Sequence, residues 1–286
     1  EYDLSVISFE EWKQKKARSS ALTSRGALRE DVALQEAYGF DLCVYIAEES
    51  GQMHPDAQRL DQLWADLRNL TGQLPQEHGY FYFRAFEAFH REDLQGFAEQ
   101  FDLYLDSERR IFEKIADCDW WIDSLIWVFT PPMEGMYGKL SELFFKYWPD
   151  CAMGWVCLAL EQGGLEGSSG EISLLLLHMA LEQDPKCFLA DYLIASIYYE
   201  QGLWRSALPY FAKASESDMY KEDASFYFDY AWACEKAGRL DAAAEYYQSV
   251  IALDEGYPSA VNNLGCIYLK QGRYDEALQS FNRAIQ

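Results

Sequence analysis

The sequence has few of the residues from which active sites and metal sites are usually built. It contains four histidines, and none is spaced with another histidine or a cysteine as metal ligands are. Glycine-rich patterns that cradle phosphates or dinucleotides are missing, as is the GxSxG pattern of a nucleophilic serine. We therefore predict no metal, no cofactor and no catalytic centre, and we expect the 47 acidic side chains to form solvated faces.

Positive charge is scarce as well. The chain has 24 Lys and Arg against 47 Asp and Glu, which gives a net charge of -23 at pH 7. A surface with this excess of negative charge repels phosphate backbones and anionic lipids, so nucleic acids and membranes are poor partners. The charge instead favours basic segments of other proteins.

Long apolar runs are also missing, so no membrane span is expected, and no secretory pattern opens the chain. The seven cysteines are an odd number, they are scattered, and none forms a CxxC pair. This distribution is not that of a disulfide framework. We therefore expect reduced thiols and a soluble, cytoplasmic protein.

What the sequence does contain is apolar and aromatic residues at helical spacing. Half of the residues are hydrophobic and 16% are aromatic, which is enough to bury a sizeable core. Apolar residues recur every three or four positions, and β-rich segments are absent. The pattern predicts an all-α fold.

The last third of the chain repeats itself. The segments "SIYYEQGLWRSALPYFAKA", "WACEKAGRLDAAAEYYQSV" and "CIYLKQGRYDEALQSFNRA" align through one glycine each, at Gly202, Gly238 and Gly272. The units begin at Phe188, Ala224 and Pro258, which lie 36 and then 34 residues apart. The two extra residues of the first interval fall in the loop "MYKED".

Each unit resembles a tetratricopeptide repeat, which folds as two antiparallel helices in about 34 residues. That family has small residues at its eighth and twenty-seventh positions, alanine at its twentieth and an aromatic residue at its twenty-fourth. The chain matches with Ala195, Ala231 and Gly265; Ala214, Val250 and Ala284; Ala207, Ala243 and Ala277; and Phe211, Tyr247 and Phe281. Where the family has a tryptophan, this chain has Asp191, Tyr227 and Val261. The resemblance implies an α–α superhelix, a solenoid of antiparallel helix hairpins.

The repeat pattern weakens towards the N-terminus. We assign residues 188–286 to three clear repeats and residues 150–187 to a degenerate repeat whose turn is lengthened by "LEGSSG". Residues 76–149 are expected to form divergent helix pairs. One pair flanks a turn at Arg91–Asp93, and another joins "CDWWIDSLIWVF" to "YGKLSELFFKYWPD". Residues 1–75 are expected to form an N-terminal helical segment or cap.

The resemblance also implies a binding surface on the first helix of each repeat. In this family the second, fifth, sixth, ninth and twelfth positions commonly line the concave groove, because they share one helix face. None of the fifteen residues at these positions is basic, so the surface is not the basic clamp by which some family members hold acidic tails. The predicted peptide-binding residues are Tyr192, Ser196, Tyr199, Phe228, Asp229, Trp232, Glu235, Asn262, Asn263, Cys266 and Leu269.

These residue types suggest what the surface binds. The aromatic residues offer flat anchors with hydrogen-bonding capacity, and the two asparagines suit the main chain of an extended peptide. Asp229 and Glu235 favour a Lys or Arg on the ligand. A competing interpretation places the aromatic residues in the core, because a shift of one position in the register buries half of them.

Three functions stay open at this point. The leading prediction is a non-catalytic protein–protein interaction module or scaffold that binds a peptide or helix of a partner. The alternative is the regulatory or targeting region of a larger enzyme whose catalytic domain lies outside this chain. The third is self-association through the last repeat, whose second helix ends without a polar cap and carries Leu278, Phe281 and Ile285 on one face. We expect that either the natural chain continues beyond Gln286 or another chain covers this face.

Overall fold

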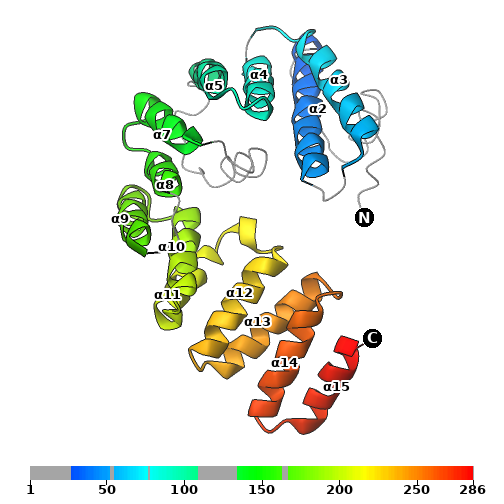
Figure 1. The fold of residues 1–286 in the computed structure, drawn as a ribbon, viewed down its shortest axis with the longest axis vertical. Helices are drawn as coiled ribbons and strands as arrows, with labels where there is room; N and C mark the ends of the chain where they lie inside the picture. Colours follow the sequence, from blue (N-terminus) through cyan, green and yellow to red (C-terminus); the bar gives the residue numbers. More distant parts are fainter. Residues whose placement is uncertain (1–26, 52–54, 77, 109–133, 163–166, 286) are drawn as a thin grey trace. The chain divides into compact units, whose positions relative to one another are not determined.

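The computed structural model describes residues 27–51, 55–76, 78–108, 134–162 and 167–285. It divides the chain into two compact units, Glu1–Tyr147 and Trp148–Gln286. Every regular element in the described ranges is a helix, and none is a strand (Figure 1). The all-α prediction is therefore confirmed. The helix expected over "CDWWIDSLIWVF" lies outside the described residues.

The first unit has an aromatic core. Its described helices are α2 (Ala27–Ser50), α3 (Ala57–Thr71), α4 (His78–His90), α5 (Leu94–Glu108) and α7 (Met136–Tyr147). Helix α2 packs on α3 and α4, α4 packs on α5, and α5 packs on α7. Phe83, Phe86, Phe97 and Phe101 are fully buried between these helices. Helices α4 and α5 flank the turn expected at Arg91–Asp93, where the Asp93 carboxylate accepts a hydrogen bond from the amide of Gly96 at 2.8 Å.

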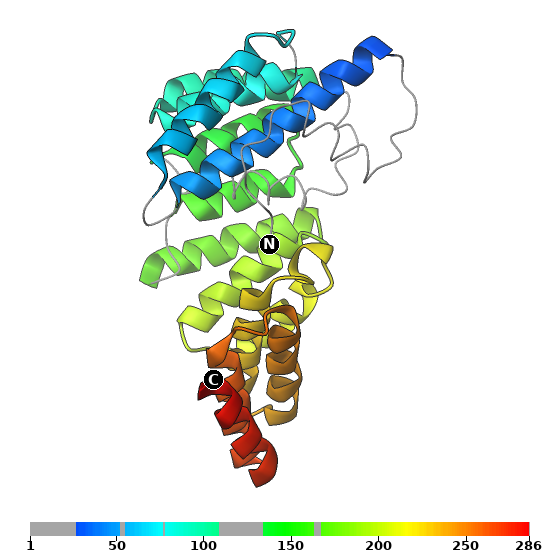
Figure 2. The same ribbon diagram turned by 90° about the vertical axis from the view of Figure 1, so that its right-hand side faces the viewer.

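The second unit is a chain of helix hairpins, which Figures 1 and 2 show from two directions. Its helices are α8 (Ala152–Glu161), α9 (Gly167–Gln183), α10 (Phe188–Glu200), α11 (Trp204–Ala214), α12 (Ala224–Lys236), α13 (Leu240–Leu253), α14 (Pro258–Lys270) and α15 (Tyr274–Ile285). From α8 to α15, each helix packs against the next one along the chain. Helices α10, α12 and α14 begin at Phe188, Ala224 and Pro258, where the sequence units begin. The solenoid prediction is confirmed.

Glycine ends the first helix of each clear repeat. Gly202, Gly238 and Gly272 have φ angles of +71°, +82° and +76°, in the left-handed region that side chains disfavour. Each of these turns is closed by a backbone hydrogen bond of the next residue, as from the Leu203 amide to the Tyr198 carbonyl at 2.8 Å. The aligned glycines therefore mark the points at which the chain reverses.

Small residues let the two helices of a repeat approach each other. Ala195, Ala207, Ala231 and Ala243 are all fully buried between paired helices. At Gly265, a Cβ atom would lie 2.7 Å from Cε1 of Phe281, so the aromatic ring of the same repeat occupies the space that a side chain would need. The family spacing of small and aromatic positions is thus explained by direct packing.

The loop between α11 and α12 accommodates the two extra residues of the first interval. It contains a 3₁₀ turn, η2 (Asp218–Tyr220), and the ring of Tyr220 stacks on that of Phe226 with centroids 4.7 Å apart. Tyr220 is buried, with 5% of its surface exposed. The longer loop therefore adds an aromatic side chain to the core of the unit.

The expected loop "LEGSSG" is wrong in its last four residues, because α9 begins at Gly167 and includes all of "GSSG". The first amides of a helix have no acceptor within it, and serine and glycine are well tolerated there. Glycine composition alone therefore does not distinguish a loop from the first turn of a helix.

Candidate interaction surface on the first helices of the repeats

The predicted binding residues lie on α10, α12 and α14, the first helices of the three clear repeats. None of the eleven is fully buried: nine are half-buried, and Asn262 and Leu269 are exposed. The set is thus neither core alone nor free surface alone. The contacts of each residue decide what it is able to offer to a ligand.

The aromatic members each pack one part of the ring against the protein. Tyr192 lies 5.1 Å from Tyr220 and 5.9 Å from Phe226 between ring centroids. Its carbonyl oxygen accepts a hydrogen bond from the Ser196 hydroxyl at 3.0 Å. Tyr192 and Ser196 are therefore held in place by the protein on one side and are accessible to a ligand on the other.

Tyr199 and Phe228 follow the same rule. Tyr199 packs edge-on against Trp204 at 5.2 Å, and Phe228 lies 5.2 Å from Tyr257 and 5.7 Å from Tyr247. Both side chains connect neighbouring elements while keeping part of their surface accessible. Each of these rings therefore has one part packed against the core and another part on the surface, so the two interpretations of the aromatic residues both hold in part.

Asp229 on α12 stands out electrostatically. It is half-buried, and the hydroxyl of Tyr199 on α10 acts on its carboxylate as a hydrogen-bond donor. Burial raises the pKa of Asp229 to about 6, and the acidic neighbours Glu200 and Asp223 reinforce the shift. The charged groups that act on Asp229 are all acidic, so this carboxylate lacks a counter-ion within the described part of the chain.

Glu235, the other predicted acidic member, is in a different situation. Lys270 of the next repeat forms an ion pair with it at 2.6 Å, and the Tyr247 hydroxyl donates a hydrogen bond to it at 3.3 Å. The Asn263 side-chain amide donates in turn to the Tyr247 hydroxyl at 3.2 Å. Glu235 and Asn263 thus link the second and third repeats to each other.

Trp232, Asn262, Cys266 and Leu269 make up the remaining part of the set. The ammonium group of Lys236 lies 4.1 Å from the centroid of the Trp232 ring, a cation–π contact. Cys266 is a free, half-exposed thiol, and Leu269 has 51% of its surface exposed. Leu269 therefore offers apolar contact area.

The sequence alone does not show which residues the predicted side chains contact. Lys270 and Tyr247 decide whether Glu235 is free, and Glu200 contributes to the field at Asp229. The predicted binding positions follow from the residue spacing within each single helix. A comparison of the twelfth position of one repeat with the thirteenth of the next would have suggested the Glu235–Lys270 pair, because adjacent repeats place these positions side by side.

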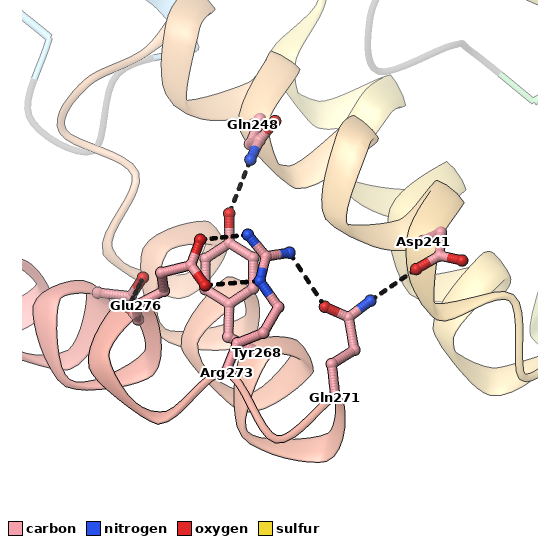
Figure 3. A network of polar contacts seen from close by, with 7 residues as sticks. Asp241, Gln248, Tyr268, Gln271, Arg273 and Glu276 are labelled. Carbon is pink, nitrogen blue, oxygen red and sulfur yellow. Dashed lines mark hydrogen bonds and ion pairs between the residues drawn. The ribbon is translucent and has the colours of Figure 1, made fainter.

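A second polar network lies at the turn between α14 and α15. Figure 3 shows that it comprises Asp241, Gln248, Tyr268, Gln271, Arg273 and Glu276. Gln271 donates to Asp241 at 2.8 Å and accepts from Arg273 at 3.2 Å, while the Arg273 guanidinium covers the Tyr268 ring at 4.1 Å. Because these groups satisfy one another, we assign the network a structural role, which is to connect α13 to the last hairpin.

Two further observations bear on the chemistry of the chain. Within the described residues, no group of three or more His, Cys, Asp or Glu side chains is arranged to hold a metal ion. In the same ranges, no helix has both the length and the apolar character needed to cross a membrane.

Comparison with known families agrees with the geometry of the second unit. Tetratricopeptide repeat models match residues 192–258 and residues 258–286. Residues 192–286, about a third of the chain, thus match the tetratricopeptide repeat. The matched residues run from within α10 to the end of α15, the part of the unit that holds the three aligned glycines.

One curated relative is the TPR repeat-containing protein MJ1428 of Methanocaldococcus jannaschii, which is 28% identical over 182 residues. The match covers 62% of this chain but 31% of the relative, so the chain spans about a third of that protein. Solved structures with a similar arrangement include a crystal structure of MamA, with 19% identity, a TM-score of 0.44 and coverage of 53% of this chain and 88% of that one. MamA 41-end from Desulfovibrio magneticus RS-1 matches with 14% identity, a TM-score of 0.44 and coverage of 62% and 93%.

Proposed function

We propose that residues 188–286 form a non-catalytic module that binds a peptide or helix of a partner protein on the accessible faces of α10, α12 and α14. Tetratricopeptide repeats support a protein-interaction scaffold in general. We further propose that residues 150–187 form a degenerate repeat that continues the array. The half-buried carboxylate of Asp229, which acts as an unmatched negative charge, is the observation that carries the binding proposal.

The surroundings of Asp229 favour a basic side chain on the ligand. Tyr192 and Tyr199 of α10 are close enough for its charge to raise the pKa of their hydroxyl groups. An ammonium or guanidinium group gains both from a carboxylate and from neighbouring aromatic rings. We therefore propose that the ligand places a Lys or Arg at Asp229, and an apolar side chain further along the surface at Leu269.

Glu235 serves as a contrast within the same surface. Its pairing with Lys270 supplies the positive charge that Asp229 lacks, although both residues are acidic and half-buried. A ligand cation at Glu235 would have to displace Lys270. The proposal therefore assigns recognition of positive charge to Asp229 alone.

A peptide library of random 12-mers, presented to the full chain, tests this proposal. We expect selected peptides to be enriched in Lys or Arg and to bind at least tenfold more weakly to Asp229→Asn, measured by fluorescence anisotropy. Glu245→Gln, an exposed change of the same charge on α13, is the matched control and should leave affinity almost unchanged. Selection of peptides without Lys or Arg, or equal losses in both variants, would contradict the proposal.

We also propose that the last helix takes part in self-association. Leu278 and Ile285 on α15 are 61% and 83% exposed, whereas Leu208 on α11 and Ala244 on α13, which correspond to Leu278, are 6% exposed beneath the following helix. Light scattering over a concentration series tests this, with Leu278→Glu as the variant that should remain monomeric. A strict monomer at high concentration of the unaltered chain would overturn it.

The location and wider context of the chain are proposals of the same kind. Cys43, Cys157 and Cys234 are free and buried, which supports a reducing compartment such as the cytoplasm. The alternative function, a regulatory or targeting region of a larger enzyme, gains some support from the relative that is about three times as long as the matched part. The coding sequence on both sides of these residues decides it.

A further inference from the structure

One buried carboxylate in the second unit serves no part of the proposed binding surface. The side chain of Asp191 on α10 has none of its surface exposed, and neither of its oxygens accepts a hydrogen bond. The Lys213 ammonium on α11 lies 4.0 Å from Oδ1, at the edge of ion-pair distance, and the Lys213 side chain is 56% exposed. Asp191 is therefore a buried carboxyl group without hydrogen bonds, and the lysine nearest to it is exposed to solvent.

The equivalent positions of the other repeats show how unusual this is. In the second repeat, Tyr227 takes the place of Asp191 and stacks on Tyr246 of the paired helix, with centroids 6.1 Å apart. In the third, the position is held by Val261, which is 3% exposed. Apolar groups thus fill this contact between the two helices in both later hairpins, and the first hairpin has a carboxyl group there.

The groups around Asp191 do not neutralise it completely. Helix α11 contributes Tyr210 and Lys213, and Glu216 follows that helix directly. Helix α9 contributes His178, whose ring lies 6.0 Å from that of Tyr210. Asp229 on α12 acts on Tyr192 and Tyr199 of α10, and Asp223, the N-cap of α12, acts on Tyr192.

A carboxyl group without hydrogen bonds is far less costly to bury when it is neutral. Burial raises the pKa of Asp191 to about 6, against the pull of Lys213 and with support from Glu216. The folded pKa thus exceeds the ordinary value of 3.8, so the folded hairpin binds the proton more tightly than the unfolded chain. Stability from this group is complete at low pH and is lost as the pH rises towards and through 6.

We propose that Asp191 makes the α10–α11 hairpin an acid-fastened joint, which closes when the carboxyl group is protonated and opens locally when it ionises. Opening would admit water to the carboxylate and let the Lys213 ammonium group come close enough to form a hydrogen bond with it. The device is confined to the first clear repeat, because the two later hairpins have Tyr227 and Val261 at this position. It does not depend on ligand binding.

Hydrogen exchange of the full chain, read peptide by peptide in a mass spectrometer, tests this joint between pH 5 and pH 8. After correction for the chemical exchange rate, peptides from residues 188–214 should open more readily at the higher pH, by about tenfold, because a carboxyl group with a folded pKa of about 6 loses only about one pH unit of its shift above pH 5. Peptides from residues 258–285 of the same molecules are the internal control and should not show this rise.

Three variants separate the joint from a general loss of stability. Asp191→Asn and Asp191→Leu should each abolish the pH dependence of the hairpin, and the second keeps the test valid if the first folds poorly. Lys213→Met should move the midpoint to higher pH, because it removes the group that opposes the rise in pKa. A hairpin whose opening ignores pH, or one whose pH dependence survives both Asp191 variants, would overturn the proposal.

Discussion

Both units of this chain bury large rings, among them Phe86 and Phe211, but in the second unit small residues also pair the helices at regular positions. In the first, large rings such as Phe83, Phe86 and Phe97 fill the space between helices. In the second, alanines such as Ala207 and Ala243 bring the helices of each hairpin together. A core of rings should suffer most from the removal of atoms, and a core of close helices from the addition of atoms.

The units also differ in the kind of polar group that they bury. His90 in the first unit packs against Phe86 at 4.5 Å, and its Nε2 has no hydrogen-bond partner. Burial lowers the pKa of His90 to about 4, whereas burial raises that of Asp191 and Asp229 in the second unit to about 6. Burial favours the neutral form of each group, but the consequences for stability run in opposite directions.

Truncation of a central ring should show the first half of the contrast. Phe86 is fully buried and stacks on Trp64 at 5.6 Å, so Phe86→Ala should lower the free energy of unfolding of its unit by about 3–5 kcal/mol. Half-buried Phe81 on the same helix is the control, and Phe81→Ala should cost much less. Hydrogen exchange during a urea titration measures both. Equal loss of protection in residues 188–285 would show that the two units unfold as one.

pH should separate the units in the same experiment. As the pH falls from 6.5 towards 4, His90 is protonated in the unfolded chain but stays neutral in the folded one. The free energy of unfolding of the first unit should therefore fall by up to about 3 kcal/mol. His90→Leu should remove this loss. Over the same window the second unit should become more stable, because folded Asp191 and Asp229 bind protons more tightly than they do unfolded. Parallel acid destabilisation of both units would contradict the assignment.

Added atoms should be costly in the second unit. Gly265→Val places a side chain where Phe281 already lies, and we expect a loss of about 1–3 kcal/mol in denaturant unfolding. Phe281→Leu in the same chain should restore part of the loss, because a smaller side chain frees the space. Absence of any rescue would mean that the cost arises from the backbone rather than from the ring.

The polar link between the second and third repeats should matter least for stability. Lys270 is half exposed, so Lys270→Met should reduce stability by about 1 kcal/mol or less. The same change frees Glu235 and should increase affinity for Lys- or Arg-containing peptides, measured by fluorescence anisotropy. Unchanged affinity would place Glu235 outside the binding surface.

The sequence predicted the second unit far better than the first, for a physical reason. Hairpins such as α12–α13 need a small residue, a glycine turn and an aromatic residue at fixed intervals, so Ala231, Gly238 and Tyr247 reveal the fold by their spacing. A core of rings places no such demand on spacing. Phe86 and Phe97 are therefore recognisable in the sequence as apolar residues, but not as members of one cluster.

The surface was predictable in position but not in its charge state. Helical spacing placed Asp229 and Glu235 on accessible faces, and both are half-buried there. Their difference depends on Lys270, which comes from another helix thirty-five residues further along the chain. Likewise, Asp191 is visible in the sequence as a departure from the family pattern, but only the packing of α10 on α11 shows that its side chain is fully buried.

The order of contacts in the second unit has a mechanical consequence. Because each helix packs on the next, a pull along the unit loads its hairpins in series, as links of a chain share one tension. Such a unit should lengthen in discrete steps of one hairpin, and the weakest link should yield first. On the proposal made for Asp191, that link at neutral pH is the α10–α11 hairpin, and acidity would set the force at which this unit begins to stretch.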